Sequence, residues 1–484
     1  MSMSDQANIS QEYGPSEDRQ KVVNDKIRSL EEKYDLLRYK VDGWCAWPVL
    51  RIWLHREAMG IGLSDERTRI KYFHQVRFAI KSLLTIFSLR KTKYLIKTCT
   101  TARAERVDHL YKDIYFDDLL DVLTDYLKIE TINNNAMLER SLKALHPSVL
   151  YTSLLALLNY TIRNLSFTRY RFISMSNQIS EIIQRELKLP IKPGIIADSL
   201  ARFYWGIRIY GYILDRVKPQ SILTEDPSEF SLLAAATSRK IKTVELAHAM
   251  CNRYHAAYSW NKYARQYKNT MPIPGKILVY GNYMKDELES WGFWSDRIIS
   301  VGSLRLDDYR VKHPWKNKND FCTLTWTTQG IRDDQLLAFI KEFLALCYLK
   351  SFDVHLIIKL HPVYDPDPGF YNRWFMDHER QVSVIGAFED PSTYELIMKS
   401  HFHLSISSSC HYEALGLDVP TIILPFANYR YFIDLVHAGH AFLPRTPNDL
   451  LEIIANPENQ KIPTTIQDRY YKTGALRNIL AEVE

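Results

Sequence analysis

The feature that most constrains the fold of this chain is a regular alternation of short apolar segments and helical segments after residue 320. The pattern predicts strands at residues 321–327, 354–359, 382–385, 403–407 and 421–424. It predicts helices at residues 333–349, 393–399, 411–417, 431–437 and 448–455. Because parallel strands need a crossover connection, usually a helix, this order indicates a doubly wound parallel α/β domain.

A less regular version of the same pattern lies earlier in the chain. Strands are expected at residues 94–99, 221–226, 242–246 and 298–301, and helices at 138–215, 230–239 and 286–291. The strand–helix–strand spacing is that of a parallel βαβ unit. Because a single hydrophobic core stops growing at about 250–300 residues, a chain of 484 residues is expected to form two such domains.

The expected domain boundaries follow from changes in polarity along the chain. We expect a disordered tail at residues 1–21, a helical N-terminal region at 22–93, a first Rossmann-like domain with a helical insertion at 94–307, a linker at 308–320 and a second Rossmann-like domain at 321–484. Two such domains facing each other across a cleft form the GT-B layout. The predicted fold class is therefore α/β of the GT-B type with a helical N-terminal extension.

Charge and cysteine content narrow the classes of function. The net charge of +6 is too small to indicate nucleic-acid binding. None of the six cysteines belongs to a CxxC pair, which argues against a zinc site or a disulfide framework and favours the reducing cytoplasm. The longest apolar-looking stretch, residues 149–162, is shorter than the ~20 residues that a membrane-spanning helix needs.

Residues 71–97 combine an apolar helical stripe with many cations. The stripe consists of Phe73, Val76, Ile80, Leu83 and Phe87, and the cations are Lys71, Arg77, Lys81, Arg90, Lys91, Lys93 and Lys97. Such a helix can lie on the anionic inner face of the cytoplasmic membrane, which would make the protein peripheral to it. The alternative is a helix that packs its stripe onto the protein core.

The first candidate site of the second domain lies at the end of a predicted strand, where ligands of parallel sheets bind. Lys359 and His361 suit an anionic diphosphate, because one is a cation and the other a hydrogen-bond donor. Pro362 stiffens the turn that follows. The alternative is a strand that simply ends in a proline beside a surface histidine.

The second candidate site lies at the end of a later strand. Ser407, Ser408 and Ser409 open a helix, whose first N–H groups can bind an anion together with the serine hydroxyls. Glu413 lies in the first turn of that helix and can accept hydrogen bonds from the two hydroxyls of a ribose. The alternatives are an ordinary serine N-cap and a carboxylate that stabilises the helix dipole.

Candidates for a catalytic base lie in the first domain. Glu225 and Asp226 end one predicted strand, and His248 follows the next. A right-handed crossover would place both strand ends on the same edge of the sheet, where a carboxylate or an imidazole could take the proton of a hydroxyl nucleophile. For His248, a purely structural, hydrogen-bonded role is the alternative.

The donor-site motifs resemble those of bacterial capsule and surface-polysaccharide glycosyltransferases. The likeness lies in Lys359-x-His361-Pro362, in the serine run, and in Glu413-Ala followed by Pro420. Related His-Pro and Ser-Ser motifs occur in bacterial sialyl- and polysialyltransferases and in teichoic-acid glycerophosphotransferases, where they bind the nucleotide phosphate. The resemblance implies this role for Lys359, His361, Ser407, Ser408 and Ser409, and a ribose contact for Glu413.

Further segments continue the resemblance over roughly residues 90–460. Thr327 and Gln329 match the family pattern at the first strand of the second domain, which implies that they also bind the donor. Residues 245–249 are similar to a Glu-Leu-Gln-His-Gly segment of these enzymes, from which the chain departs at Ala247 and Ala249. Other matching positions are Gly281, Gly302 and Arg305.

The resemblance implies a glycosyltransferase that moves a sugar from a CMP-, CDP- or UDP-linked donor to a glycan or a lipid-linked glycan. The product would be a bacterial surface polysaccharide, such as a capsule, an O-antigen or an exopolysaccharide, and the motifs imply neither a metal nor a cofactor. Three alternatives remain open: a CDP-polyol phosphotransferase, a nucleotide-sugar 2-epimerase on the same fold, and a scaffold without activity. The sequence does not decide the sugar, the acceptor or the stereochemistry of transfer.

Overall fold

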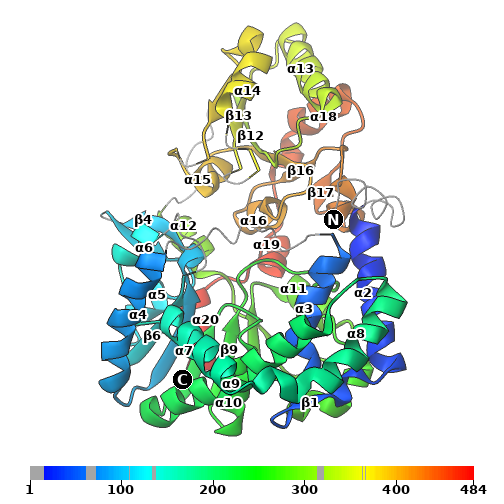
Figure 1. Cartoon of the computed structure of the whole chain (residues 1–484). Helices are drawn as coiled ribbons and strands as arrows, with labels where there is room; N and C mark the ends of the chain where they lie inside the picture. The colour runs from blue at the N-terminus through cyan, green and yellow to red at the C-terminus, as the bar shows by residue number, and fades with distance from the viewer. Residues whose placement is uncertain are drawn as a thin grey trace.

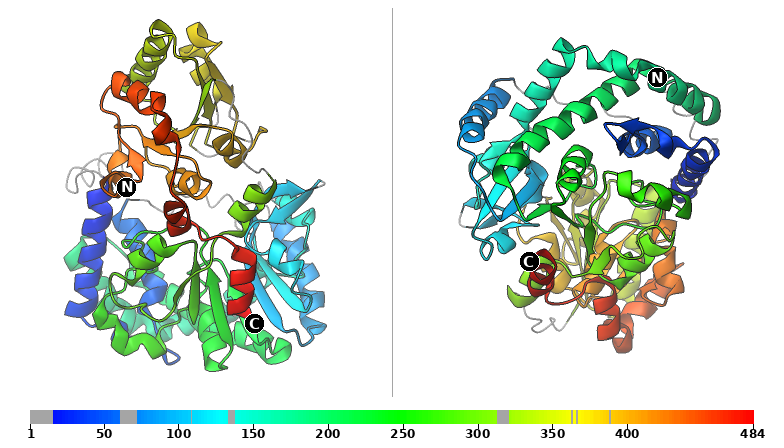
Figure 2. Two further views of the ribbon diagram at one scale, coloured as in Figure 1. Left: turned by 180° about the vertical axis from the view of Figure 1, so that it is seen from behind. Right: turned by 90° about the horizontal axis from the view of Figure 1, so that it is seen from below.

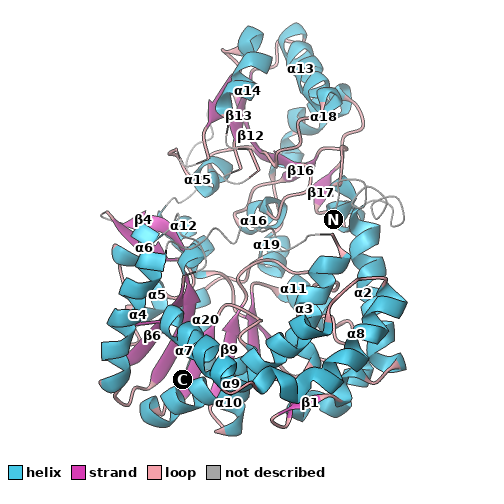
Figure 3. Cartoon of the chain, in the orientation of Figure 1, coloured by secondary structure: helices cyan, strands magenta, loops and turns pink. Residues whose placement is uncertain are grey.

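Two parallel sheets, each in its own lobe, dominate the computed structural model of the chain (Figure 1). The structure describes residues 16–60, 72–107, 109–132, 138–312, 321–361, 364–365, 367–387 and 389–484. Helices flank both sheets (Figure 3). Among the described residues, no helix combines the length and the apolar character that crossing a membrane requires.

The sheet of the first lobe has seven parallel strands in the order β11-β10-β9-β8-β3-β6-β7. They are β3 (Tyr94–Cys99), β6 (Tyr126–Thr131), β7 (Leu150–Tyr151), β8 (Ser221–Thr224), β9 (Lys242–Leu246), β10 (Lys276–Val279) and β11 (Ile298–Ser300). The predictions of β3, β8, β9 and β11 are confirmed, whereas β6, β7 and β10 have no counterpart among the predicted strands. Because β8 pairs with β9 in parallel, with Thr224 opposite Glu245, the carboxyl ends of these two strands lie side by side.

The sheet of the second lobe has six parallel strands in the order β14-β13-β12-β15-β16-β17. They are β12 (Cys322–Thr327), β13 (Val354–Lys359), β14 (Val382–Ile385), β15 (Phe402–Ser405), β16 (Thr421–Ile423) and β17 (Ala441–Phe442). All five strands predicted here are confirmed within two residues, and β17 adds an edge strand. Its helices are α13 (Asp334–Leu349), α14 (Pro368–Trp374), α15 (Thr393–Met398), α16 (Cys410–Gly416), α17 (Ile433–His437) and α18 (Pro447–Ala455).

The first lobe owes its larger size to a helical layer. Its helices are α5 (Asp117–Leu120), α6 (Leu138–Leu142), α7 (Thr152–Leu165), α8 (Ile173–Leu187), α9 (Pro193–Val217), α10 (Phe230–Ser238), α11 (Asn282–Glu289) and α12 (Leu304–Lys312). Two antiparallel hairpins accompany them, β1 (Lys40–Val41) with β2 (Trp44–Cys45), and β4 (Arg103–Val107) with β5 (Leu110–Asp113). The expected linker at 308–320 needs correction, because its first five residues complete α12; residues 313–320 lie outside the described chain.

The described part of the N-terminal region contains the α-helices α2 (Ser16–Lys33), α3 (Trp47–Ala58) and α4 (Tyr72–Phe87). The expected disordered tail is therefore wrong from Ser16 onward, and residues 1–15 lie outside the described chain. A buried ion pair joins α2 to α3, with Arg51 Nε 2.6 Å from Glu31 Oε1. The same guanidinium donates to the Ser259 carbonyl oxygen at 3.0 Å, in the loop after β9. The region is thus packed into the first lobe rather than separate from it.

The end of the chain returns to the first lobe, which corrects the expected second domain at 321–484. After α19 (Thr464–Tyr470), helix α20 (Ala475–Val483) lies beside the first sheet, as the left view of Figure 2 shows. Its side chains Ala475, Ile479 and Val483 are buried in the apolar cluster there. The returning segment passes so close to Gly281 and Gly302 that a Cβ at either position would collide with the backbone of Arg469 or Lys472. This close approach explains why glycine stands at both positions.

Candidate active site

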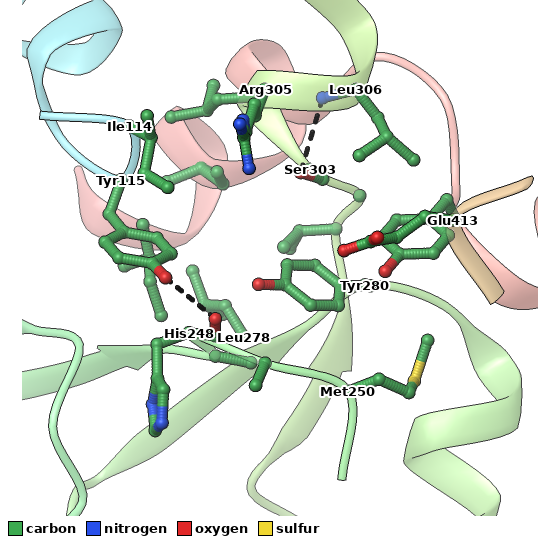
Figure 4. Close-up of a pocket in the computed structure, with 18 of the residues that line it drawn as sticks. Ile114, Tyr115, His248, Met250, Leu278, Tyr280, Ser303, Arg305, Leu306 and Glu413 are labelled. Carbon is green, nitrogen blue, oxygen red and sulfur yellow. Dashed lines mark hydrogen bonds between the residues drawn. The ribbon is translucent and has the colours of Figure 1, made fainter. Parts of the chain in front are cut away.

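A cavity of about 150 Å³ lies where the two lobes meet (Figure 4). The first lobe contributes Tyr115, His248, Tyr280 and Arg305, and the second lobe contributes Tyr394, Ser409 and Glu413. Figure 4 shows Arg305 and Tyr280 between the side of Tyr115 and the side of Glu413. A ligand that spans this cavity would touch groups from both lobes. We call this space the interlobe cavity.

A larger cavity of about 760 Å³ adjoins it on the first lobe. Its wall includes Ile52, His55 and Arg56 from α3, Met59 directly after α3, Cys99 at the end of β3, Glu225 and Asp226 after β8, His248 and His255 after β9, and Tyr431 from the second lobe. His248 lines both cavities, so it stands at their junction. We call the larger space the α3 cavity.

His248 is held by two hydrogen bonds, one to its ring and one to its backbone. Its Nδ1 lies 2.8 Å from the carbonyl oxygen of Glu225. Because a carbonyl can only accept, Nδ1 is the donor, and in the neutral form of the ring the lone pair therefore lies on Nε2. The His248 carbonyl oxygen in turn accepts from the Tyr115 hydroxyl at 2.8 Å. The residue is thereby fixed in one orientation and in the tautomer of a proton acceptor.

Glu225 presents a buried carboxyl to the α3 cavity. It is 3% exposed, and the Cys99 thiol, a weak donor, lies beside it. Burial raises the pKa of Glu225 to about 8, although the nearby cation of Lys97 opposes this shift. At neutral pH the group is therefore mostly protonated and can donate a hydrogen bond to a ligand.

Asp226 also lines the α3 cavity, but its side chain forms hydrogen bonds within its own loop. Oδ1 accepts from the backbone N–H of Ser228 at 2.7 Å and from the Ser228 hydroxyl, which closes the turn before α10. The structure thus brings together the three residues that the sequence singled out, Glu225, Asp226 and His248. His248 has the geometry of a base and Glu225 that of an acid, whereas Asp226 supports the loop between them.

Buried charges beneath the site fix the turn that carries Tyr115. The Lys128 ammonium lies 3.0 Å from Asp113 Oδ2 and 2.6 Å from Asp117 Oδ1, and all three side chains are inaccessible to solvent. Burial alone would raise the pKa of Asp113, but Lys128 and Arg103 outweigh it and lower that pKa. Asp113 Oδ1 accepts from the backbone N–H of Tyr115 at 3.1 Å. The ionised aspartate therefore aims the Tyr115 hydroxyl at His248.

The second lobe contributes an acidic group to the interlobe cavity. Glu413 Oε1 accepts from the Tyr394 hydroxyl at 2.7 Å, which leaves Oε2 to face a ligand. The Arg305 guanidinium lies over the Tyr394 ring, 4.3 Å from its centroid. The cavity therefore holds a carboxylate, which can accept from ligand hydroxyls, close to a cation, which suits a phosphate.

Lys359, which the sequence predicts to bind the donor, has backbone partners for all of its N–H groups in the structure. Its ammonium donates to the carbonyl oxygens of Gly386 at 2.9 Å, Glu389 at 2.6 Å and Pro391 at 3.1 Å. An ammonium has three N–H groups, so none is left for a phosphate, and the side chain is only 3% exposed. Lys359 closes the loop after β14 instead.

Thr327 and Gln329 also have structural partners in place of the expected donor. The buried Thr327 hydroxyl lies 2.9 Å from His403 Nε2, inside the sheet. Gln329 Nε2 donates to the Ser407 carbonyl oxygen at 2.6 Å, and Gln329 Oε1 accepts from the Ser407 N–H and hydroxyl, both at 2.9 Å. Gln329 therefore positions the serine turn, and contact with a ligand is left to other side chains.

The remaining motif residues differ in where they lie. Ser409 lines the interlobe cavity, whereas the Ser408 hydroxyl accepts from the Cys410 N–H at 3.2 Å in the turn before α16. His361 Nδ1 accepts from the Tyr364 N–H at 3.1 Å, so its proton is on Nε2, and burial lowers its pKa. His361 lines neither cavity. Pro362 lies outside the described residues.

Several lining residues have no place among the sequence candidates. Tyr115 and Tyr280 follow β5 and β10, which the pattern did not predict, and His55 lies on α3, far away in the chain. Arg305 matches the family pattern, but the resemblance assigns no role to it. A run of apolar residues before Tyr280, at 277–279, is the one signal that could have placed a strand end there.

The comparisons with known proteins agree with this architecture. No family model matches the chain, and no curated protein matches it in sequence. UDP-GlcNAc 2-epimerase from Neisseria meningitidis, solved with UDP-GlcNAc, is similar with a TM-score of 0.51 and 16% identity over 81% of this chain and 98% of that one. MurG from Acinetobacter baumannii has a TM-score of 0.47 and 9% identity over 81% of this chain and 99% of that one. The chain has the GT-B fold, as predicted.

Proposed function

We propose that this protein is a glycosyltransferase that uses a nucleotide-activated sugar. The observation that carries the proposal is the position of His248, which has an open Nε2 and stands between two cavities. One cavity offers groups suited to a nucleotide and the other has room for a second substrate. Proteins that share the fold add support, since the Neisseria enzyme is named for UDP-GlcNAc.

The donor would bind in the interlobe cavity. Glu413 would accept hydrogen bonds from the ribose hydroxyls, with Tyr394 holding one of its oxygens in place. Arg305 would offset the charge of the phosphates, and Ser409 would add a hydroxyl donor. The base is a pyrimidine in this proposal, as in CMP-, CDP- or UDP-linked sugars, which rests on the motif resemblance.

The acceptor would enter the α3 cavity with a hydroxyl directed at His248. Nε2 takes the proton of that hydroxyl while its oxygen forms a bond to the anomeric carbon of the donor. The bond from this carbon to the phosphate oxygen breaks, and the nucleotide leaves with the electron pair. Protonated Glu225 donates a hydrogen bond within the same space, which helps to orient the acceptor.

The resemblance further suggests that the acceptor is a glycan, free or linked to a lipid, of a bacterial surface polysaccharide. The six cysteines, all free, fit the reducing cytoplasm, where we propose that the enzyme works. The open α3 cavity of about 760 Å³ has the size of a site for a sugar unit, which also supports transfer to a second substrate.

A nucleotide-sugar 2-epimerase is the second candidate, because His248 and protonated Glu225 form a base and an acid within one site. The two activities differ in a measurable way. An epimerase converts the nucleotide sugar without an acceptor and exchanges the hydrogen at C2 with solvent. A transferase releases the nucleotide and leaves that hydrogen in place, so incubation in D₂O followed by NMR separates the two.

The proposed function is tested by binding first and by turnover second. Thermal shift with UDP, CDP, CMP and GDP should show stabilisation by at least one pyrimidine nucleotide, because a ligand of the folded state raises the melting temperature. In the His248→Ala variant, release of nucleotide from the sugar donor should slow by about 10²–10⁴ at unchanged nucleotide affinity. Absence of nucleotide binding, or a parent rate in the variant, would contradict the proposal.

A further inference from the structure

Helix α4 has two opposite apolar faces, only one of which packs on the protein. The packed face consists of Phe78, Ala79, Ser82 and Ile86, all buried. The opposite face consists of Ile80, Leu83, Leu84 and Phe87, which are 57%, 43%, 71% and 80% exposed. At 3.6 residues per turn these four side chains fall on one side of the helix. We call this exposed side the α4 face.

The exposure of the α4 face bears on the two interpretations of the apolar helical stripe, contact with a membrane and packing onto the protein core. Of the stripe residues with described side chains, Ile80, Leu83 and Phe87 are exposed, so packing of the stripe onto the core is wrong for them. The other stripe residues, Phe73 and Val76, have no described side chains. One expected cation also needs correction, since Lys97 is buried in β3 and lies 2.6 Å from Glu229 Oε1.

Exposed apolar side chains continue on the neighbouring helix. The Thr85 hydroxyl of α4 donates to the Val149 carbonyl oxygen at 2.9 Å, shortly before α7 begins, and Figure 1 shows α4 on the flank of the first lobe. Along α7 the exposed apolar residues are Leu157 at 54%, Tyr160 at 60% and Leu165 at 75%. Apolar exposure on two adjacent helices marks a surface for interaction.

Charge along these segments has a single sign. Residues 72–104 and residues 140–180 contain no aspartate and no glutamate. Exposed cations on or just after α4 are Lys81, Arg90 and Lys91. Apolar side chains accompanied by cations, without acids, complement the anionic head groups and the acyl boundary of a bilayer.

We propose that the α4 face docks the first lobe onto an anionic lipid bilayer. A second copy of this chain fits the face less well, because a two-fold interface would place Lys81, Arg90 and Lys91 against the same cations. The proposal goes beyond the proposed function and does not depend on it. If both hold, the lobe that carries the α3 cavity works at the membrane surface.

The test is sedimentation of the full chain with vesicles of phosphatidylglycerol and phosphatidylcholine, compared with vesicles of phosphatidylcholine alone. The parent protein should pellet with the anionic vesicles only. The double variant Leu84→Glu with Phe87→Glu should reduce the bound fraction at least about tenfold, since it removes apolar side chains and adds negative charge. Both side chains are exposed in the folded protein, so its melting temperature should not change.

A matched control places the same substitutions elsewhere. Tyr348→Glu with Leu349→Glu changes side chains that are 78% and 76% exposed at the end of α13, on the second lobe, and should leave vesicle binding unchanged. Three results would overturn the proposal: no binding of the parent to anionic vesicles, retained binding in the α4 variant, or equal loss in the control. A parent dimer that becomes monomeric in the α4 variant would also overturn it. No substrate is used, so failure here leaves the proposed activity untouched.

Discussion

Replacing Glu225 by glutamine should make the stability of the protein less sensitive to alkaline pH. The Glu225 carboxyl is buried beside the weak thiol donor of Cys99, and burial raises its pKa from 4.5 to about 8. Between these two values the folded protein keeps a proton that the unfolded chain releases. The free energy of unfolding is therefore highest below pH 4.5 and falls as the pH rises toward 8.

The size of the effect follows from the interval between the two pKa values. Each pH unit of difference corresponds to about 1.36 kcal/mol, so full deprotonation of Glu225 costs the folded state about 5 kcal/mol. Glutamine keeps nearly the same shape and cannot ionise, so the Glu225→Gln variant escapes this loss. Glu245 is also buried, which raises its pKa to about 8, but it is present in both proteins and cancels in the difference.

The assay is urea unfolding of parent and variant at pH 5 and at pH 9. The parent should lose about 4 kcal/mol more stability than Glu225→Gln between the two values, because about 1 kcal/mol of the effect is already lost at pH 5. Equal losses would refute the reasoning, because they would mean that Glu225 is already ionised at pH 5, beside Lys97. In that case the group could not act as a hydrogen-bond donor in the α3 cavity at neutral pH.

Three further predictions concern side chains that hold or line the site. Tyr115→Phe removes the hydroxyl that bonds to the His248 carbonyl, so kcat should fall about tenfold with KM nearly unchanged, as measured by steady-state nucleotide release. Glu413→Gln should weaken nucleotide binding about tenfold in calorimetry, and a 2′,3′-dideoxynucleotide should lose affinity only for the parent. Lys359→Ala leaves three carbonyl oxygens without their donor and should lower the free energy of unfolding by about 1–3 kcal/mol, as measured in urea. If stability is unchanged and nucleotide affinity is lost, Lys359 binds the ligand after all.

The fold was predictable wherever periodicity was strong. In the second lobe every expected strand is present, because these strands read as short apolar runs between turn signals. In the first lobe β6 was missed, since its central residues include Lys128 and Glu130, which are buried and charged. Their partners are Asp113 and Arg103, and pairing across the fold has no local signature.

The candidate site was predictable in part, by a rule about strand ends. Glu225, Asp226 and His248 do meet, because β8 and β9 are adjacent and parallel. The rule could not assign roles, since a strand end may serve either a ligand or the protein itself. It also could not find His55 or Met59, because the position of α3 against the cavity depends on the buried pair of Arg51 and Glu31.

A side chain that binds a ligand can be told from one that supports the fold by whether its hydrogen-bonding atoms already have partners in the protein. Lys359 and Glu225 both end parallel strands and both are 3% exposed. The Lys359 ammonium donates all three of its N–H groups to backbone carbonyls, whereas the Glu225 carboxyl has the weak thiol donor of Cys99 beside it and lines a cavity. A buried polar atom without a strong hydrogen-bond partner lowers the stability of the folded protein. At a cavity wall, a ligand that supplies the missing hydrogen bond recovers this free energy on binding. By this criterion we expect Glu225 and the Nε2 of His248 on the first lobe to meet a ligand, and the motif lysine of the second lobe to hold the loop after β14 in place.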